Sequence, residues 1–141
     1  MAKTCENVLF LCTGNSCRSI MAEMLLNHIG NGKYKAYSAG SFPTGEVHPK
    51  SLETLNKHGI KALKPYSKSW DSFSDINFDL VITVCDQAAG EVCPVFLGNP
   101  KKLHWSIADP AKATGSTEDI DNAFDEAFNA LKNRIEKELL S

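Results

Sequence analysis

Short apolar runs alternate along the chain with segments in which apolar residues recur every three or four positions. Apolar runs of about four to eight residues are typical of buried parallel strands, and the longer period is typical of helices. The predicted strands cover residues 7–11, 35–39, 78–84 and 102–105. The predicted helices cover residues 19–29 and 49–58 and a long segment after Ser116, which is a good N-cap residue. Strands alternating with helices predict an α/β sandwich with a parallel sheet.

Two cysteines follow directly after predicted strands. Cys12 ends the stretch "NVLFLC", and Cys85 follows "FDLVITV". Ligands of parallel α/β folds bind beyond the carboxyl ends of the strands. Both thiols are therefore expected at the binding edge of the sheet.

The loop from Cys12 to Ser19, "CTGNSCRS", has the composition of an anion site. Gly14 allows a tight path, and Asn15 tolerates a left-handed conformation, so several N–H groups can converge ahead of a helix N-terminus. Arg18 adds a planar fork suited to a tetrahedral oxyanion. Positive potential favours the thiolate of Cys12, and the Ser19 hydroxyl is a candidate donor to it. The residues expected to bind the anion are Thr13, Gly14, Asn15, Ser16, Cys17 and Arg18.

A second interpretation of this loop is a buried Cys12 beside an unrelated surface Arg18. A cysteine and an arginine at this spacing are common, and only their place between a strand and a helix favours a site. The nucleotide-binding pattern G-x-x-x-x-G-K-[ST] is absent. The loop alone thus predicts a thiolate that meets an oxyanion, without separating hydrolysis from reduction.

Composition narrows the class of protein. The chain has 141 residues, 43% of them hydrophobic, and we expect residues 1–141 to form one domain and to act as a monomer. The net charge of -2 argues against nucleic-acid or membrane-surface binding. No apolar stretch approaches the roughly 18 residues of a membrane span. Five cysteines, an odd number, without a secretory signal indicate a cytoplasmic protein without a disulfide framework.

Longer stretches of the sequence resemble the low-molecular-weight phosphotyrosine phosphatase family, and within it the arsenate reductase branch. The matching stretches are "VLFLCTGNSCRSIMAEM", "YSAG", "VHPKSLETL", "FDLVITVCD" and "HWSIADPA". The resemblance implies a three-layer sandwich with a four-stranded parallel sheet. It implies Cys12 as the nucleophile, Arg18 as the oxyanion binder and Ser19 as the thiolate stabiliser.

The resemblance also changes the interpretation of Asp109, in "IADPA". From residues alone, Asp-Pro is a turn signal. The family's general acid occupies such an Asp-Pro loop, so the resemblance implies that Asp109 protonates the leaving oxygen. Phosphatases of this type usually carry an aromatic residue after the proline, whereas this chain has Ala111.

Cys85 and Cys93 match no common zinc spacing, and no paired histidines lie near them in the sequence. In a helix the two would lie about 12 Å apart, whereas a disulfide needs Cα atoms within about 7 Å. Gly90 and Pro94 weaken a helix there, so the segment can unwind. Two inert buried cysteines are the alternative.

The resemblance implies a relay of three thiols that converts arsenate to arsenite. Cys12 attacks arsenate, Cys85 then attacks Cys12, and Cys93 attacks Cys85. The expected partner is thioredoxin, or a glutathione–glutaredoxin system, because the spacing of the two relay cysteines exceeds the usual one by one residue. No bound cofactor is expected. The alternative function is hydrolysis of phosphomonoesters by a tyrosine phosphatase.

Some relatives bind potassium through residues that match Asn15, Glu23 and Ser38 here. Their further aspartate aligns with Ser69, and the adjacent Lys68 could supply positive charge instead. We therefore expect no metal site.

Overall fold

The computed structural model describes residues 6–12, 17–30, 32–40, 45–60, 67–69, 73, 76–84 and 100–140. Its four strands form one sheet in the order β2-β1-β3-β4, and every pair is parallel. The strands are β1 (Glu6–Leu11), β2 (Tyr34–Ala39), β3 (Leu80–Thr83) and β4 (Lys101–His104). The prediction of an α/β sandwich built on a four-stranded parallel sheet is confirmed.

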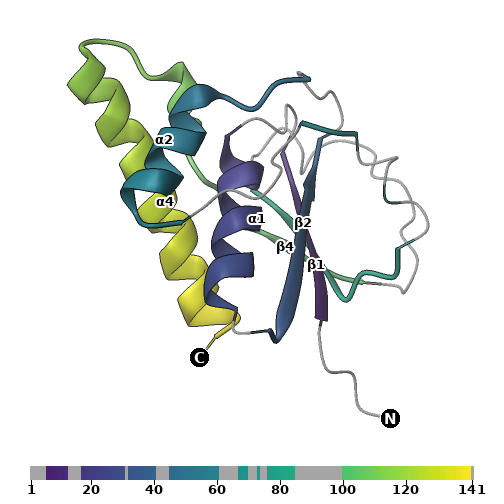
Figure 1. The fold of residues 1–141 in the computed structure, drawn as a ribbon. Helices are drawn as coiled ribbons and strands as arrows, with labels where there is room; N and C mark the ends of the chain where they lie inside the picture. The colour runs from purple at the N-terminus through teal and green to yellow at the C-terminus, as the bar shows by residue number, and fades with distance from the viewer. Residues whose placement is uncertain are drawn as a thin grey trace.

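Three helices pack against one face of this sheet and against one another (Figure 1). They are α1 (Arg18–Ile29), α2 (Pro49–Lys57) and α4 (Thr117–Glu138). A short 3-10 turn, η2 (Pro110–Lys112), precedes α4. The helix predicted over 19–29 begins one residue earlier, at Arg18, which places this arginine in the first turn.

Strand β1 runs through the centre of the core. Val8 and Phe10 face the three helices, whereas Leu9 and Leu11 face a second cluster that includes Phe78. These four residues of β1 are each at most 1% exposed. A strand covered on both faces is expected to be continuously apolar, which is why "VLFL" shows no alternation.

The outer edge of β2 is occupied by groups from elsewhere in the chain. The Asn27 side chain of α1 bonds both backbone groups of Ala36: its Oδ1 accepts from the Ala36 N–H at 2.8 Å, and its Nδ2 donates to the Ala36 carbonyl at 3.2 Å. Just beyond β2, the Gly40 N–H donates to the Lys68 carbonyl at 2.9 Å. Gly40 also forms a parallel bridge with Ser69.

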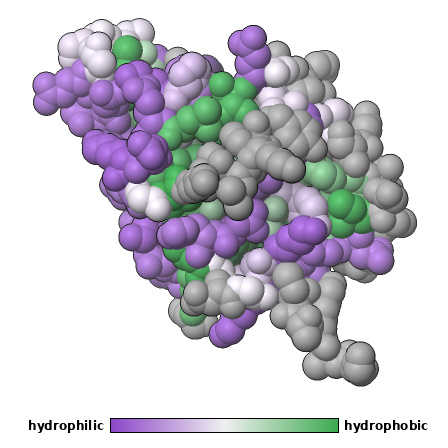
Figure 2. Space-filling model, viewed as in Figure 1, coloured by the Kyte–Doolittle hydropathy of each residue, from purple (hydrophilic) through white to green (hydrophobic). Residues whose placement is uncertain are grey.

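Helix α4 buries one stripe, which consists of Phe124, Ala127, Phe128, Leu131 and Ile135. Hydrophilic side chains cover much of the molecule over α2 and α4, and hydrophobic ones show mainly in the seams between elements (Figure 2). The N-terminus of α4 carries a capping box, in which the Ser116 Oγ accepts from the Asp119 N–H and the Asp119 carboxylate accepts from the Ser116 N–H, both at 3.1 Å. None of the helices within the described residues could span a membrane.

Candidate active site

Cys12 lies at the carboxyl end of β1, as predicted from the sequence. Its N–H donates to the Ala39 carbonyl at 3.2 Å, so the parallel ladder with β2 continues through it. The preceding carbonyl, of Leu11, accepts from the Val84 N–H at 2.9 Å. These two hydrogen bonds hold the backbone at Cys12 to the neighbouring strands on both sides. The Cys12 residue itself is buried, at 5% exposure.

The end of β3 lies directly beside the end of β1, since Thr83 pairs with Leu11. Cys85 itself lies outside the described residues, as do Cys93 and the loop residues Thr13, Gly14, Asn15 and Ser16. The thiol relay therefore stays a prediction. The last three residues of the stretch are described: Cys17 is the N-cap of α1, Arg18 and Ser19 lie in its first turn, and Cys17 and Ser19 are buried.

Arg18 reaches from α1 to the segment that follows β4. Its Nη1 donates to the Ile107 carbonyl at 2.8 Å, and its Nη2 lies 3.6 Å from the Asp109 Oδ2. Its Nε is buried and has no hydrogen-bond acceptor within the described part of the chain. A buried donor without an acceptor is costly, so this group is suited to an anion that arrives from outside.

The N-terminus of α1 is itself attractive to an anion. The first N–H groups of a helix lack acceptors within the helix and carry the positive end of its dipole. The first turn of α1 contains no acidic side chain that would neutralise this end. Arg18 adds a full positive charge in the same turn, so this end of the helix fits an oxyanion.

The segment that carries Asp109 is attached to the same edge of the sheet. The Trp105 N–H donates to the Thr83 carbonyl at 2.8 Å, and the Ile107 N–H donates to the Val84 carbonyl at 3.3 Å. The η2 turn follows, and there the Lys112 N–H donates to the Asp109 carbonyl at 3.2 Å. Asp109 is therefore held beside Arg18 although 91 positions separate the two in the sequence (109 − 18).

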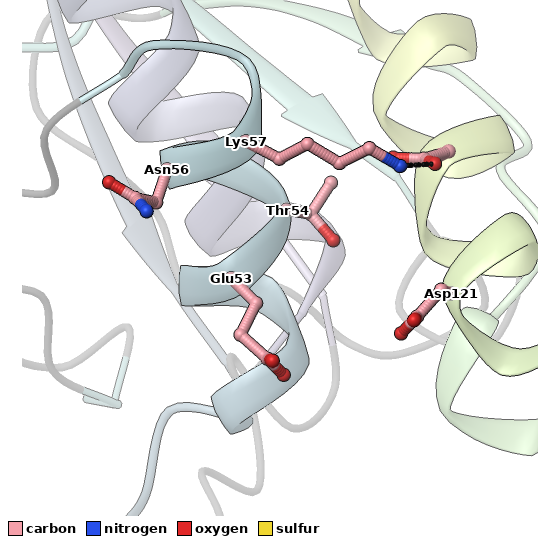
Figure 3. Close-up of a pocket in the computed structure, with 6 residues that line it drawn as sticks. Glu53, Thr54, Asn56, Lys57 and Asp121 are labelled. Atoms are coloured by element: carbon pink, nitrogen blue, oxygen red, sulfur yellow. Dashed lines mark hydrogen bonds and ion pairs between the residues drawn. The ribbon is translucent and has the colours of Figure 1, made fainter. Parts of the chain in front are cut away.

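Within the described part of the chain, two cavities border the helices, and one of them includes Asp109 in its lining. The first, of about 280 Å³, is bordered by the 106–110 segment, which includes Asp109, and by one face of α4. The second, of about 290 Å³, lies between α2 and α4, where Lys57 points across to α4 (Figure 3). None of the predicted site residues lines the second cavity, so it is not the candidate active site.

Glu23 and Ser38, which the sequence resemblance linked to potassium binding, both contact the Lys68 ammonium, and Glu23 and Lys68 form a buried ion pair. Lys68 Nζ lies 3.4 Å from the Glu23 Oε1 and 3.2 Å from the Ser38 Oγ, and the Ser38 hydroxyl donates to the same carboxylate. We call these three residues the Glu23–Ser38–Lys68 cluster. The Lys68 ammonium occupies the space beside the Glu23 and Ser38 oxygens, so a metal ion cannot bind these two oxygens at the same time. The described residues contain no group of three or more His, Cys, Asp or Glu side chains that could hold a metal.

Burial opposes both charges of this cluster. It raises the pKa of Glu23 above its usual value, although the Lys68 ammonium opposes the shift. It also lowers the pKa of Lys68, and there the Glu23 carboxylate opposes the shift.

The family model described as low molecular weight phosphotyrosine protein phosphatase matches residues 7–140. The chain belongs to this family. The match covers the cysteine loop, Cys85, Cys93 and the Asp-Pro segment.

Several similar members of this family are arsenate reductases. The chain is 36% identical to the arsenate reductase of Bacillus subtilis over 130 residues, which is 92% of each chain. It is 30% identical to the solved arsenate reductase of Archaeoglobus fulgidus, with a TM-score of 0.71 over 91% of this chain and 98% of that one. A thioredoxin-dependent arsenate reductase of Corynebacterium glutamicum shares 28% identity, with a TM-score of 0.65 over 97% of this chain and 65% of that one.

The sequence did not indicate one contact of the site, the Ile107 carbonyl that receives Arg18. A backbone acceptor has no residue signature, so no sequence signal could have found it. The sequence did indicate Lys68 as a source of positive charge, but not that its ammonium contacts both Glu23 and Ser38.

Proposed function

We propose that this chain is an arsenate reductase that converts arsenate to arsenite through Cys12. The observation that carries the proposal is Arg18: it is held by the Ile107 carbonyl and Asp109, and its Nε donor has no acceptor within the described residues. Arsenate is a tetrahedral oxyanion whose oxygens can accept from this donor and from the N-terminus of α1. The named relatives support arsenate as the substrate.

In the first step, the Cys12 thiolate attacks the arsenic atom and forms a sulfur–arsenic bond. One arsenic–oxygen bond breaks, and the oxygen leaves as water after Asp109 supplies a proton. Arg18 and the α1 N-terminus stabilise the charge on the remaining oxygens. The Ser19 hydroxyl stabilises the thiolate before the attack.

The second step transfers the electrons. The Cys85 thiolate attacks the Cys12 sulfur, the sulfur–arsenic pair passes to arsenic, and As(V) leaves as As(III) in arsenite. Cys93 then attacks the Cys85 sulfur, releases Cys12 as a thiolate and leaves a Cys85–Cys93 disulfide. An external dithiol reduces this disulfide and completes the cycle.

Thioredoxin is the proposed reductant, because a relative of this fold is described as thioredoxin-dependent. A glutathione–glutaredoxin system is the alternative. Either reductant places the reaction in the cytoplasm, where thiols are kept reduced.

The test measures arsenite release from the reduced protein with arsenate and each reductant in turn, with disulfides mapped by mass spectrometry. We expect turnover with thioredoxin and its reductase. The double variant Cys85→Ser/Cys93→Ser should retain the Cys12–arsenic adduct and lose turnover. Cys5→Ser is the matched control and should leave adduct formation and turnover as in the wild type.

Each part of the proposal has its own contrary result. Turnover that survives in the double variant contradicts the relay but not the loop. No arsenite with any reductant, together with rapid hydrolysis of an aryl phosphate, favours a phosphatase. That second function is kept because the family model describes phosphatases and because phosphate has the shape of arsenate.

A further inference from the structure

The Glu23–Ser38–Lys68 cluster joins three segments of the chain: α1, β2 and the 67–69 segment. Glu23 belongs to α1, four residues after Ser19 and therefore on the same side of the helix. Ser38 belongs to β2 and lies opposite Phe10 in the register with β1. Lys68 belongs to the 67–69 segment beyond the edge of β2.

Each segment also has a backbone or helical connection to the candidate site. The residue after Ser38 is Ala39, whose carbonyl accepts from the Cys12 N–H. The Lys68 carbonyl accepts from the Gly40 N–H one residue further on. The helix that carries Glu23 begins with Arg18. A displacement of α1 relative to β2 would therefore move Arg18 relative to Cys12.

The Lys68 ammonium lies against the buried Glu23 carboxylate and offsets its charge. The side chains of Glu23 and Lys68 are only 14% and 5% exposed, so an uncompensated Glu23 carboxylate would be poorly solvated. The ammonium supplies the offsetting positive charge through a covalent tether instead of through a bound ion. Its contacts with Glu23 and Ser38 join α1 to β2.

We propose that Lys68 is a positioning residue: its ammonium is a built-in monovalent cation that holds the start of α1 against the end of β2. In this way it keeps Arg18 and Cys12 in the arrangement that binds an oxyanion, and to this extent the inference rests on the proposed function. The Glu23–Ser38–Lys68 cluster takes the place of a bound potassium ion. An enzyme built in this way needs no added monovalent cation.

The test is chemical rescue of Lys68→Ala, which leaves an ammonium-sized space beside the Glu23 carboxylate and the Ser38 hydroxyl. The readout is protection of Cys12 by inorganic phosphate against alkylation by iodoacetamide, measured on its peptide by mass spectrometry. We expect phosphate affinity to fall about tenfold or more, since small displacements of binding groups cost that much. Ammonium or methylammonium chloride should restore it, whereas tetramethylammonium chloride at equal ionic strength should not.

Lys50→Ala is the matched control. Lys50 is also part of an ion pair, with its Nζ 2.7 Å from the Asp121 Oδ1, but that pair joins α2 to α4. This variant should keep the phosphate affinity of the wild type and respond equally to all three salts.

A second variant covers the case in which Lys68→Ala does not fold. Glu23→Gln/Lys68→Met removes both charges and fills the space, so it should fold, bind phosphate weakly and show no ammonium response. Wild-type phosphate affinity in either variant, or equal rescue by ammonium and tetramethylammonium, would overturn the inference alone. If phosphate fails to protect Cys12 in the wild type, the proposed function falls, and the inference falls with it.

Discussion

The N-termini of α1 and α4 are built in opposite ways. Ser116 and Asp119 close the start of α4 with two reciprocal hydrogen bonds, and Glu118 and Asp119 place negative charge at the positive end of its dipole. The start of α1 has no acidic residue and instead carries Arg18, whose Nε has no acceptor within the described residues. One terminus supplies its own anion, and the other is left ready for an external one.

This difference separates stability from function within one fold. A closed capping box satisfies N–H groups that would otherwise lack partners, and it stabilises the helix. An open terminus forgoes that stabilisation and retains an anion site. Changes at α1 should therefore affect binding and turnover, and changes at α4 should affect the free energy of unfolding.

The largest expected effect comes from Arg18→Lys. Lysine keeps the charge but lacks the planar fork that reaches Ile107 and Asp109 together. We expect turnover with arsenate to fall roughly 10³-fold, the scale of losing an oxyanion donor. Steady-state kinetics measure the fall in turnover, and protection of Cys12 by phosphate against alkylation measures the anion affinity. Unchanged phosphate affinity would contradict the role given to this terminus.

A smaller effect is expected from Asp109→Asn. The amide cannot donate the proton that the leaving oxygen needs, so kcat should fall roughly 10²-fold. Phosphate should still protect Cys12, because the variant removes no donor from the anion site. Asp121→Asn, in the ion pair between α2 and α4, is the control and should leave kcat unchanged. A loss of phosphate binding that equals the loss of kcat would argue against a role as the acid.

At the other terminus, Ser116→Ala should lower the free energy of unfolding by about 1 kcal/mol. Removal of the Ser116 hydroxyl leaves the Asp119 N–H without its acceptor. Thermal unfolding should show a melting temperature lower by about 4 °C. Ser116→Gly should cost less, because glycine is tolerated at this position. Turnover and phosphate affinity should not change; a change in either would show that the two termini are not independent.

The smallest effect concerns Asp125, on the body of α4. A hydrogen bond from Lys57 lowers the pKa of this carboxyl below its usual 3.8, aided by His58. A lowered pKa stabilises the fold above the unfolded-state pKa, and this contribution is lost as pH falls through the folded-state value. Asp125→Asn should therefore destabilise the protein slightly at pH 7 and not at pH 2. Unfolding midpoints at both pH values test this, and an equal difference at both would contradict it.

The sequence predicted the elements well because their periods are strong. The strand over 7–11 and the helix over 49–58 differ from β1 and α2 by one residue. The strand predicted over 78–84 is shorter, Leu80–Thr83, although Asp79 still pairs with Asn7 through its backbone and its carboxylate. Apolar character identifies such runs, but ladder hydrogen bonds determine where they end.

The candidate site was less accessible to sequence reasoning. Cys12 and Arg18 lie close together in the sequence between a predicted strand and a predicted helix, and this placement allowed them to be paired. Asp109 is brought to Arg18 only because β4 follows β3 in the sheet, and an order of strands leaves no local signal. The resemblance to a family, not the residues, supplied that pairing. The relay cysteines Cys85 and Cys93 stay predictions.

The Asn27 side chain protects one edge of the sheet against the addition of a strand from another copy of the protein. By bonding both backbone groups of Ala36, it acts as a one-residue substitute for a neighbouring strand at the rim of the sheet. Exposed rims are templates on which another chain can add a strand and start aggregation. Along β2 that route is obstructed by Asn27 and, further on, by the 67–69 segment. At the opposite rim, β4 presents the exposed charges of Lys101 and Lys102, which resist strand addition by repulsion.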